Sequence, residues 1–181
     1  MKIENFHETT TATETIYEGR VINLRKDDVK LSNGHVAQRE IVEHRGAICV
    51  VPVGDDGKIM LVRQFRKPAE QALLEIPAGS LEKGEDPLDC AHRELLEECG
   101  LKTAKMTPLF QCYLAPGYSS EYIYGFLAQA LEQTEAQPEE DEILELESYS
   151  LKELLPMIED GRIRDAKTIC GVLLWARISG V

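Results

Sequence analysis

The 181-residue chain has no hydrophobic run long enough to cross a membrane, because no stretch approaches the roughly 18 consecutive apolar residues that a spanning helix needs. Its first residues are polar and acidic and contain no apolar signal core. Basic residues are scarce too: 20 Lys and Arg stand against 32 Asp and Glu, which gives a net charge of −12. A surface this anionic repels nucleic acid and acidic lipid. We therefore expect a cytoplasmic protein with neither a nucleic-acid nor a membrane partner.

Cysteine and histidine are also sparse, and neither forms a zinc-binding pattern. The four histidines are scattered, and no two of the five cysteines share a C-x-x-C spacing. The cysteines are Cys49, Cys90, Cys99, Cys112 and Cys170. A zinc site would therefore have few candidate ligands, and we expect buried free thiols in a reducing cytosol. If the protein acts on phosphates, we expect its carboxylates to hold the metal.

The hydrophobic pattern predicts an α/β fold in two parts. Short β-type runs between residues 16 and 42, with a hairpin turn at 32–34, predict a small antiparallel β meander over 1–43. The polar residues 1–15 are expected to fray or to pack late. The remainder, 44–181, predicts an α/β sandwich, in which the apolar strand 47–53 is covered on both faces. Its other expected strands are 58–65, 73–77, 108–114, 121–130 and 143–149, and its expected helices are 87–99, 150–158 and 165–178.

The helix 87–99 has clear signals at both ends. Asp86 suits the N-cap, Pro87 the first helical position and Gly100 the left-handed residue after the end. At about 100° per residue, one arc of this helix is apolar and the neighbouring arc, about 100° wide, is acidic. The apolar arc contains Leu88, Ala91, Leu95 and Cys99, and the acidic arc contains Glu94, Glu97 and Glu98.

Three carboxylates on one arc repel one another, so the acidic arc needs compensation. A solvated acidic face would supply it through water and counterions. A hard divalent cation such as Mg²⁺ would supply it through direct carboxylate ligation, leaving some of its positions for water and phosphate. The helix pattern alone leaves both interpretations open.

The surrounding spacing favours the cation. Gly79 is followed after five residues by Glu85 and after seven more by the segment 93–101, which reads RELLEECGL. This pattern resembles the Nudix box, G-x5-E-x7-R-E-U-x-E-E-x-G-U with U an apolar residue, at every fixed position. The resemblance implies a Nudix-type α/β/α sandwich with a mixed sheet. It also implies that Glu94, Glu97, Glu98 and the Ala78 carbonyl hold Mg²⁺ or Mn²⁺, with Glu97 counted as catalytic too.

The remaining box residues have separate physical interpretations. Gly79 would permit a tight turn from strand to loop, and Gly100 would end the helix. Arg93 lies four residues before Glu97, so we expect it to brace Glu97 or Glu85 rather than to bind substrate. The resemblance assigns the same bracing role to this arginine.

Outside the box, residues 16–178 resemble the ADP-ribose pyrophosphatase branch of the family. The matching segments are 63–66 (RQFR), 75–79 (EIPAG), 115–117 (APG) with Glu121, and 165–168 (DAKT). The resemblance implies Mg²⁺-dependent hydrolysis of ADP-ribose to AMP and ribose 5-phosphate by a homodimer, in which each meander helps to form the partner's pocket. The meander itself is too small to bury both of its faces, which also favours a partner subunit.

The resemblance further implies which residues meet the substrate. The expected binding residues are Arg63, Arg66, Pro116, Gly117 and Glu121, and the expected base is Glu140 or Glu142, with Glu139 behind them. Arg66 could instead be a surface charge paired with an acid. Ala115 stands where the branch often has serine, so other nucleoside diphosphate sugars, such as ADP-glucose or GDP-mannose, stay open. A non-catalytic nucleotide-sugar sensor is the rival class, but a sensor would be expected to have a decayed box.

Overall fold

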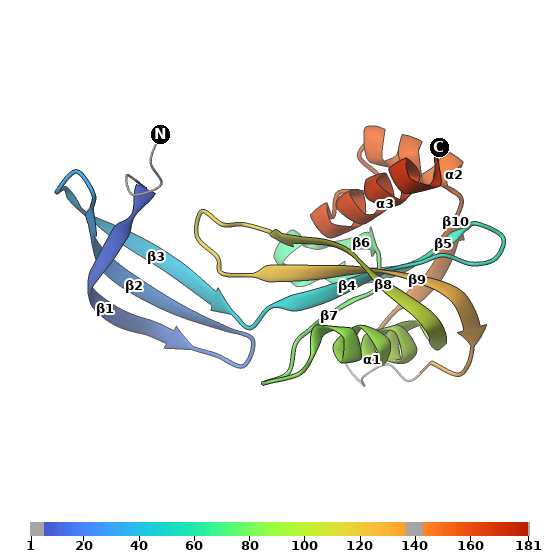
Figure 1. Cartoon of the computed structure of the whole chain (residues 1–181), viewed down its shortest axis with the longest axis horizontal. Helices are drawn as coiled ribbons and strands as arrows, with labels where there is room; N and C mark the ends of the chain where they lie inside the picture. Colours follow the sequence, from blue (N-terminus) through green and yellow to red (C-terminus); the bar gives the residue numbers. More distant parts are fainter. Residues whose placement is uncertain (1–5, 137–142, 181) are drawn as a thin grey trace. The chain divides into compact units, whose positions relative to one another are not determined.

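The computed structural model describes residues 6–136 and 143–180, in a chain that divides into two compact units (Figure 1). Unit 1 contains Met1–Gly46 and Tyr113–Tyr122, and unit 2 contains Ala47–Cys112 and Ile123–Val181. The hairpin 113–122 groups with the N-terminal strands because Val42 N donates to the Tyr118 carbonyl (2.8 Å) and Ser120 N donates to the Val42 carbonyl (2.9 Å). Unit 1 therefore holds one segment more than the 1–43 meander expected from the sequence.

Unit 1 is built on an antiparallel meander in the order β1-β2-β3. The strands are β1 (Glu8–Glu18), β2 (Ile22–Leu31) and β3 (Val36–His44). Of the two expected behaviours of residues 1–15, fraying is wrong from Glu8 onward, because β1 pairs with β2. All side chains of β1 are exposed, so the strand is held by main-chain pairing with β2 and by ion pairs to neighbouring strands. Two such ion pairs are Glu14–Lys26 and Glu8–Arg39, each at 2.6 Å.

Unit 2 contains two sheets, in the orders β7-β4-β9-β8 and β10-β5-β6. The strands are β4 (Ala47–Pro52), β5 (Ile59–Arg66), β6 (Gln71–Glu75), β7 (Ala78–Ser80), β8 (Leu101–Tyr113), β9 (Tyr122–Gln133) and β10 (Glu145–Tyr149). The first sheet is mixed, because β4 runs parallel to β9 and antiparallel to β7. Every residue of β4 is buried, as its apolar sequence predicts. β8 begins at Leu101, seven residues earlier than expected.

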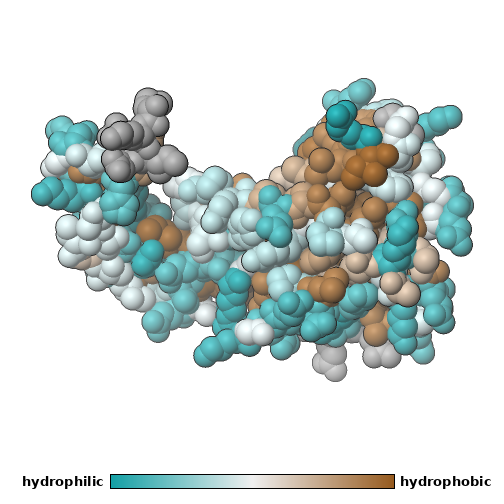
Figure 2. All heavy atoms as spheres, in the orientation of Figure 1, coloured by the Kyte–Doolittle hydropathy of each residue, from teal (hydrophilic) through white to brown (hydrophobic). Residues whose placement is uncertain are grey.

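Helices cover both faces of the unit 2 sheets, which confirms the predicted α/β/α sandwich (Figure 1). α1 (Pro87–Cys99) packs on β4 and β7, while α2 (Leu151–Glu159) packs on α3 (Ala166–Ser179), which contacts β4 from the other side. Hydrophobic residues also reach the surface over α2 and α3 (Figure 2). In the described part of the chain, no helix is both long and apolar enough to cross a membrane.

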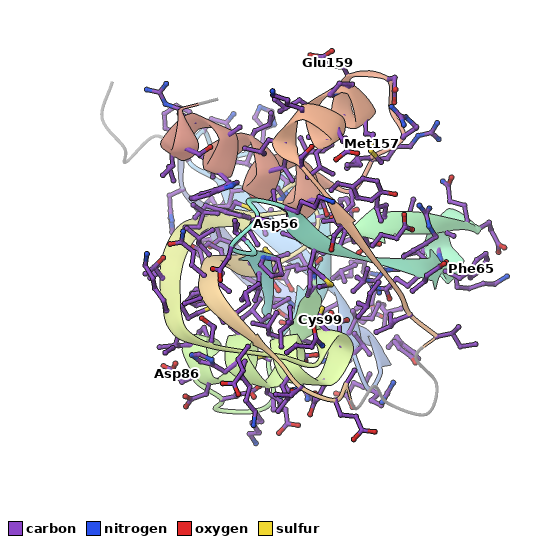
Figure 3. All side chains as sticks on the ribbon, turned by 90° about the vertical axis from the view of Figure 1, so that its right-hand side faces the viewer. Asp56, Phe65, Asp86, Cys99, Met157 and Glu159 are labelled. Atoms are coloured by element: carbon purple, nitrogen blue, oxygen red, sulfur yellow. The ribbon has the colours of Figure 1, made fainter. Side chains whose placement is uncertain are left out.

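Both ends of α1 form as the sequence predicts. The Asp86 carboxylate accepts a hydrogen bond from Leu88 N (2.8 Å), and Gly100 adopts φ 62° while its N–H bonds to the Leu96 carbonyl (2.9 Å). Asp86 and Cys99 mark the two ends of the helix in Figure 3. All five cysteines are free thiols. Cys49, Cys90 and Cys99 are buried as expected, whereas Cys112 is only partly buried and Cys170 is exposed, so the expected burial is wrong for these two.

Candidate active site

The buried face of α1 includes carboxylates. Its buried residues are Cys90, Ala91, Glu94, Leu95, Glu98 and Cys99. On a wheel with about 100° per residue, they form one arc centred between the expected acidic and apolar arcs. Glu94 is only 9% exposed and Glu98 only 3%, whereas Leu88, expected in the core, is 40% exposed in the first turn. The acidic arc of α1 is therefore not fully solvated, because two of its three carboxylates are buried.

Gly79 makes the burial of Glu94 possible. It lies in strand β7 and pairs with Ile48 of β4, so the expected tight turn at this glycine is not what the structure shows. A Cβ at residue 79 would lie 1.9 Å from Glu94 Oε1 and 2.0 Å from its Cδ. The missing side chain leaves the space that the carboxylate occupies. On the same strand, Ala78 N donates to Glu98 Oε2 (3.1 Å), so two carboxylates of α1 lie directly against β7.

Arg93 braces the carboxylates from one side. Its Nε and Nη2 contact the two Glu85 oxygens at 2.9 and 3.1 Å, and its Nη1 contacts Glu94 Oε1 at 2.8 Å and Glu97 Oε2 at 3.0 Å. This bidentate bond from Arg93 lowers the pKa of Glu85 to about 2. Arg93 thus contacts both of the glutamates that the sequence offered as partners, and Glu94 as well.

The charges of this cluster fit a divalent cation. Glu85, Glu94, Glu97 and Glu98 carry four negative charges, whereas Arg93 supplies one positive charge among them. Carboxylate oxygens are the donors that hard cations such as Mg²⁺ prefer. The donor chemistry and the space beside Gly79 therefore suit the ion. Across 6–136 and 143–180, however, no three His, Cys, Asp or Glu side chains are already gathered as a metal cluster.

Arg66 lies near this cluster and is itself firmly held. Its Nε and Nη2 donate to the two oxygens of Glu75 at 2.9 and 2.8 Å. This bond, with the charge of nearby Glu98, raises the pKa of Arg66. Arg66 is therefore paired with an acid, the alternative that the sequence left open, but it is still half-exposed and near a predicted metal ligand.

Glu75 has a second cationic partner that sequence reasoning missed. Lys167 Nζ lies 2.5 Å from Glu75 Oε2 and 3.0 Å from Asp165 Oδ1. Burial alone would raise the pKa of Glu75, but Arg66 and Lys167 outweigh that effect and hold it below its ordinary value. The available signal was an acid inside the otherwise apolar segment 73–77, since a buried charge needs a partner.

The other expected binding residues are held locally. Arg63 Nε lies 2.5 Å from Glu147 Oε1, and the Tyr149 hydroxyl donates to the same carboxylate. In unit 1, Tyr118 N donates to the Ala115 carbonyl at 3.1 Å. The two residues between them, Pro116 and Gly117, are the central residues of this turn.

Two kinds of expected site residue remain. Glu121, also in unit 1, accepts a hydrogen bond on its carbonyl from Leu114 N at 3.3 Å. The candidate bases Glu139, Glu140 and Glu142 lie outside the described residues.

Comparison with protein families identifies the larger part of the chain. Residues 43–171 match the NUDIX domain, and residues 8–42 match the nucleoside diphosphate sugar hydrolase N-terminal domain. The chain belongs to the Nudix family. Nudix hydrolases generally need a divalent metal, in agreement with the carboxylate cluster on α1.

Individual relatives agree over nearly the whole chain. The ADP-ribose pyrophosphatase of Bacillus subtilis (strain 168) is 45% identical over 168 residues, which cover 92% of this chain and 91% of that protein. The methanol dehydrogenase activator of Bacillus methanolicus is 44% identical over 169 residues, with the same coverage of both chains. A solved structure described as an ADP compounds hydrolase superposes with a TM-score of 0.83 and 26% identity, covering 96% of each chain.

Proposed function

We propose that this Nudix protein hydrolyses the pyrophosphate bond of ADP-ribose, giving AMP and ribose 5-phosphate, with Mg²⁺ as the metal and Mn²⁺ as a substitute. The observation that carries the proposal is the burial of Glu94 and Glu98 against β7, where Gly79 leaves room for a carboxylate and Arg66 lies nearby. The resemblance to ADP-ribose pyrophosphatases over 92% of the chain supports the substrate.

In this proposal the chain's residues divide the work. Glu94, Glu97, Glu98 and the Ala78 carbonyl would hold the metal, which would neutralise the diphosphate and polarise a water molecule. Gly79 leaves space for the Glu94 side chain, and the Arg93–Glu85 ion pair helps to fix the position of α1, which carries the expected metal ligands. A carboxylate of the acidic loop, Glu140 or Glu142 with Glu139 in reserve, would take the proton from the water.

The expected substrate residues would recognise different parts of the substrate. Arg66 and Arg63 would donate to the diphosphate oxygens, for which a planar guanidinium is well suited. Pro116, Gly117 and Glu121 would meet the nucleoside or the sugar. A non-catalytic sensor remains the rival, and the complete set of box carboxylates argues against it.

We also propose a cytoplasmic homodimer in which the meander of residues 1–43 packs on the partner subunit. Several large apolar side chains of the meander are exposed in the single chain, which supports this assembly. They are Ile16, Tyr17, Val21, Ile22 and Val36.

A substrate panel tests the function. We compare kcat/KM for ADP-ribose, ADP-glucose, GDP-mannose and a nucleoside triphosphate, and identify the products of each reaction. ADP-ribose should be hydrolysed best and the triphosphate worst, because binding groups meant for the terminal sugar would stay unpaired. If another nucleoside diphosphate sugar has the highest kcat/KM, the proposed substrate changes. If the triphosphate has the highest kcat/KM, the assignment to the ADP-ribose pyrophosphatase branch is wrong.

A further inference from the structure

A chain of hydrogen-bonded polar side chains joins three elements of unit 2, and its Arg66 lies near Glu98 of α1. We call it the Glu75 network, and its members are Arg66 at the end of β5, Glu75 at the end of β6, and Asp165, Lys167 and Thr168 at the start of α3. Two cations and two anions make it neutral. Glu75 belongs to the segment EIPAG and Lys167 to the segment DAKT. The proposed function gives neither of these two residues a role.

Lys167 is the innermost cation of this network. The residue is 7% exposed, and its ammonium lies between Glu75 Oε2 at 2.5 Å and Asp165 Oδ1 at 3.0 Å. A buried charge is tolerated only where it is paired, and both of these partners are protein carboxylates. Lys167 is therefore placed to hold Glu75 rather than to bind a phosphate.

Glu75, held in place by Lys167, in turn restricts the orientation of Arg66. The carboxylate is 2% exposed and accepts two parallel hydrogen bonds from the guanidinium, a geometry that fixes the guanidinium plane as well as its position. A free arginine would lose considerable rotamer entropy on binding a ligand. With Glu75 immobilised, Arg66 has already lost it.

We propose that Lys167 is a positioning residue for substrate binding: it immobilises Glu75, and Glu75 in turn aims Arg66 at the diphosphate. This inference rests on the proposed function, in which Arg66 binds the diphosphate of the substrate. Loss of Lys167 then acts on the enzyme only through Arg66, and its main effect is on KM.

A purely structural role for Lys167 predicts something different. Thr168 Oγ1 donates to Asp165 Oδ2 and accepts from Ile76 N (2.9 Å), so the start of α3 also supports the link 76–77 that leads from β6 to Ala78. If Lys167 served only this support, its loss would disturb the metal ligands and would add to the loss of Arg66. A double-mutant cycle separates the two roles.

The experiment measures kcat and KM for Lys167→Met, Arg66→Ala and the double variant in the full chain with Mg²⁺. The substrate is whichever nucleoside diphosphate sugar the unmodified chain hydrolyses best. Each single variant should lose about 10- to 100-fold in kcat/KM, mostly through KM, as is usual for residues that hold a functional group in place. The double variant should match Arg66→Ala within about twofold. Losses that multiply would overturn the positioning role.

Two further variants serve as controls. Lys67→Met removes an exposed ammonium 2.6 Å from Glu70, directly after Arg66 in the chain, and should stay within about twofold of the unmodified enzyme. Lys167→Arg keeps the positive charge, so its KM should lie between that of Lys167→Met and that of the unmodified enzyme. If either control fails, with Lys67→Met as damaging as Lys167→Met or no recovery in Lys167→Arg, the role assigned to Lys167 is wrong.

The design keeps the two proposals separate. If Lys167→Met does not fold, Glu75→Gln replaces it in the same cycle, with the same expected lack of additivity. A preference for another sugar nucleotide would change the substrate of the proposed function and leave the cycle valid. If the unmodified chain turns over none of them, the Kd for ADP-ribose replaces kcat/KM, and multiplying losses in Kd still contradict the positioning role.

Discussion

At the scale of single residues, the carboxylates of α1 owe their positions to small features of their neighbours. Glu94 fits because residue 79 has no side chain, Glu98 is fixed by the Ala78 N–H, and Glu97 is held from one side by Arg93. A glycine in a strand usually weakens the strand, so its presence here indicates a close approach. In this protein the approaching group is a predicted metal ligand.

Gly79→Ala should therefore damage activity more than stability. The new Cβ would collide with the Glu94 carboxylate, which can move because it is the end of a flexible side chain, whereas β7 itself accepts alanine. We expect a loss of about 10- to 100-fold in kcat/KM, the range seen when the support of a metal ligand is removed. Steady-state kinetics and thermal unfolding measure the two effects.

A control for Gly79→Ala uses the ligand itself. In a Glu94→Gln background, the same glycine substitution should cost little further activity, because the displaced group no longer ligates. Undiminished activity of Gly79→Ala alone would show that the position of Glu94 is unimportant.

The Glu85–Arg93 pair predicts a pH-dependent stability. Arg93 lowers the pKa of Glu85 from 4.5 to about 2, so the charged pair stabilises the fold fully above pH 4.5. That contribution is lost as pH falls from 4.5 towards 2, where Glu85 becomes protonated in the folded state. The free energy of unfolding of the unmodified chain should thus exceed that of Glu85→Gln by a constant amount above pH 4.5, and by less at lower pH.

Chemical denaturation across this pH range measures the difference between the two chains. In an Arg93→Met background most of the pH-dependent difference should disappear, because the guanidinium that is its main cause is gone while the hydrogen bond from Glu82 N remains. An undiminished difference without Arg93 would show that another group is the main cause of the lowered pKa of Glu85.

At the scale of elements, α1 depends on its caps for the register of its carboxylates. Asp86→Ala removes the side chain that accepts from Leu88 N and should cost about 1 kcal/mol of stability. Turnover at temperatures where the variant is folded should change little, because Asp86 is far along the helix from Glu94 and Glu98. Denaturant titration and kinetics check the two parts, and a large loss of turnover with intact stability would contradict this view of the cap.

The two ends of α1 could be predicted from sequence because their signals are local. Asp86, Pro87 and Gly100 define α1 through hydrogen bonds within a few residues of themselves. The role of Gly79 could not be predicted in the same way, because its requirement comes from Glu94, fifteen positions further along. The same holds for Glu75 and Lys167, which are 92 positions apart and meet only in the folded chain.

At the scale of the whole molecule, the proposed dimer predicts a specific weakness of the meander. Tyr17 and Val36 are exposed on β1 and β3, and a charge at either position would oppose burial in a subunit interface. Tyr17→Glu and Val36→Glu should each shift the chain from dimer towards monomer. Light scattering at several concentrations measures the shift.

A polar position of the same strand provides the control for the dimer. Thr9→Glu adds the same charge to β1 at an exposed residue and should change the assembly less. An unmodified chain that is monomeric at all concentrations, or variants that stay dimeric, would contradict the proposed role of the meander.

The central claim is that the carboxylates of α1 hold a divalent metal for hydrolysis of a pyrophosphate bond. The most direct test follows ADP-ribose and its products by phosphorus NMR, with Mg²⁺ and with EDTA, for the unmodified chain and for Glu98→Gln. The account predicts AMP and ribose 5-phosphate with Mg²⁺, no turnover with EDTA, and a kcat at least about two to three orders of magnitude lower for Glu98→Gln. Unchanged turnover in Glu98→Gln, or full activity in EDTA, would contradict it.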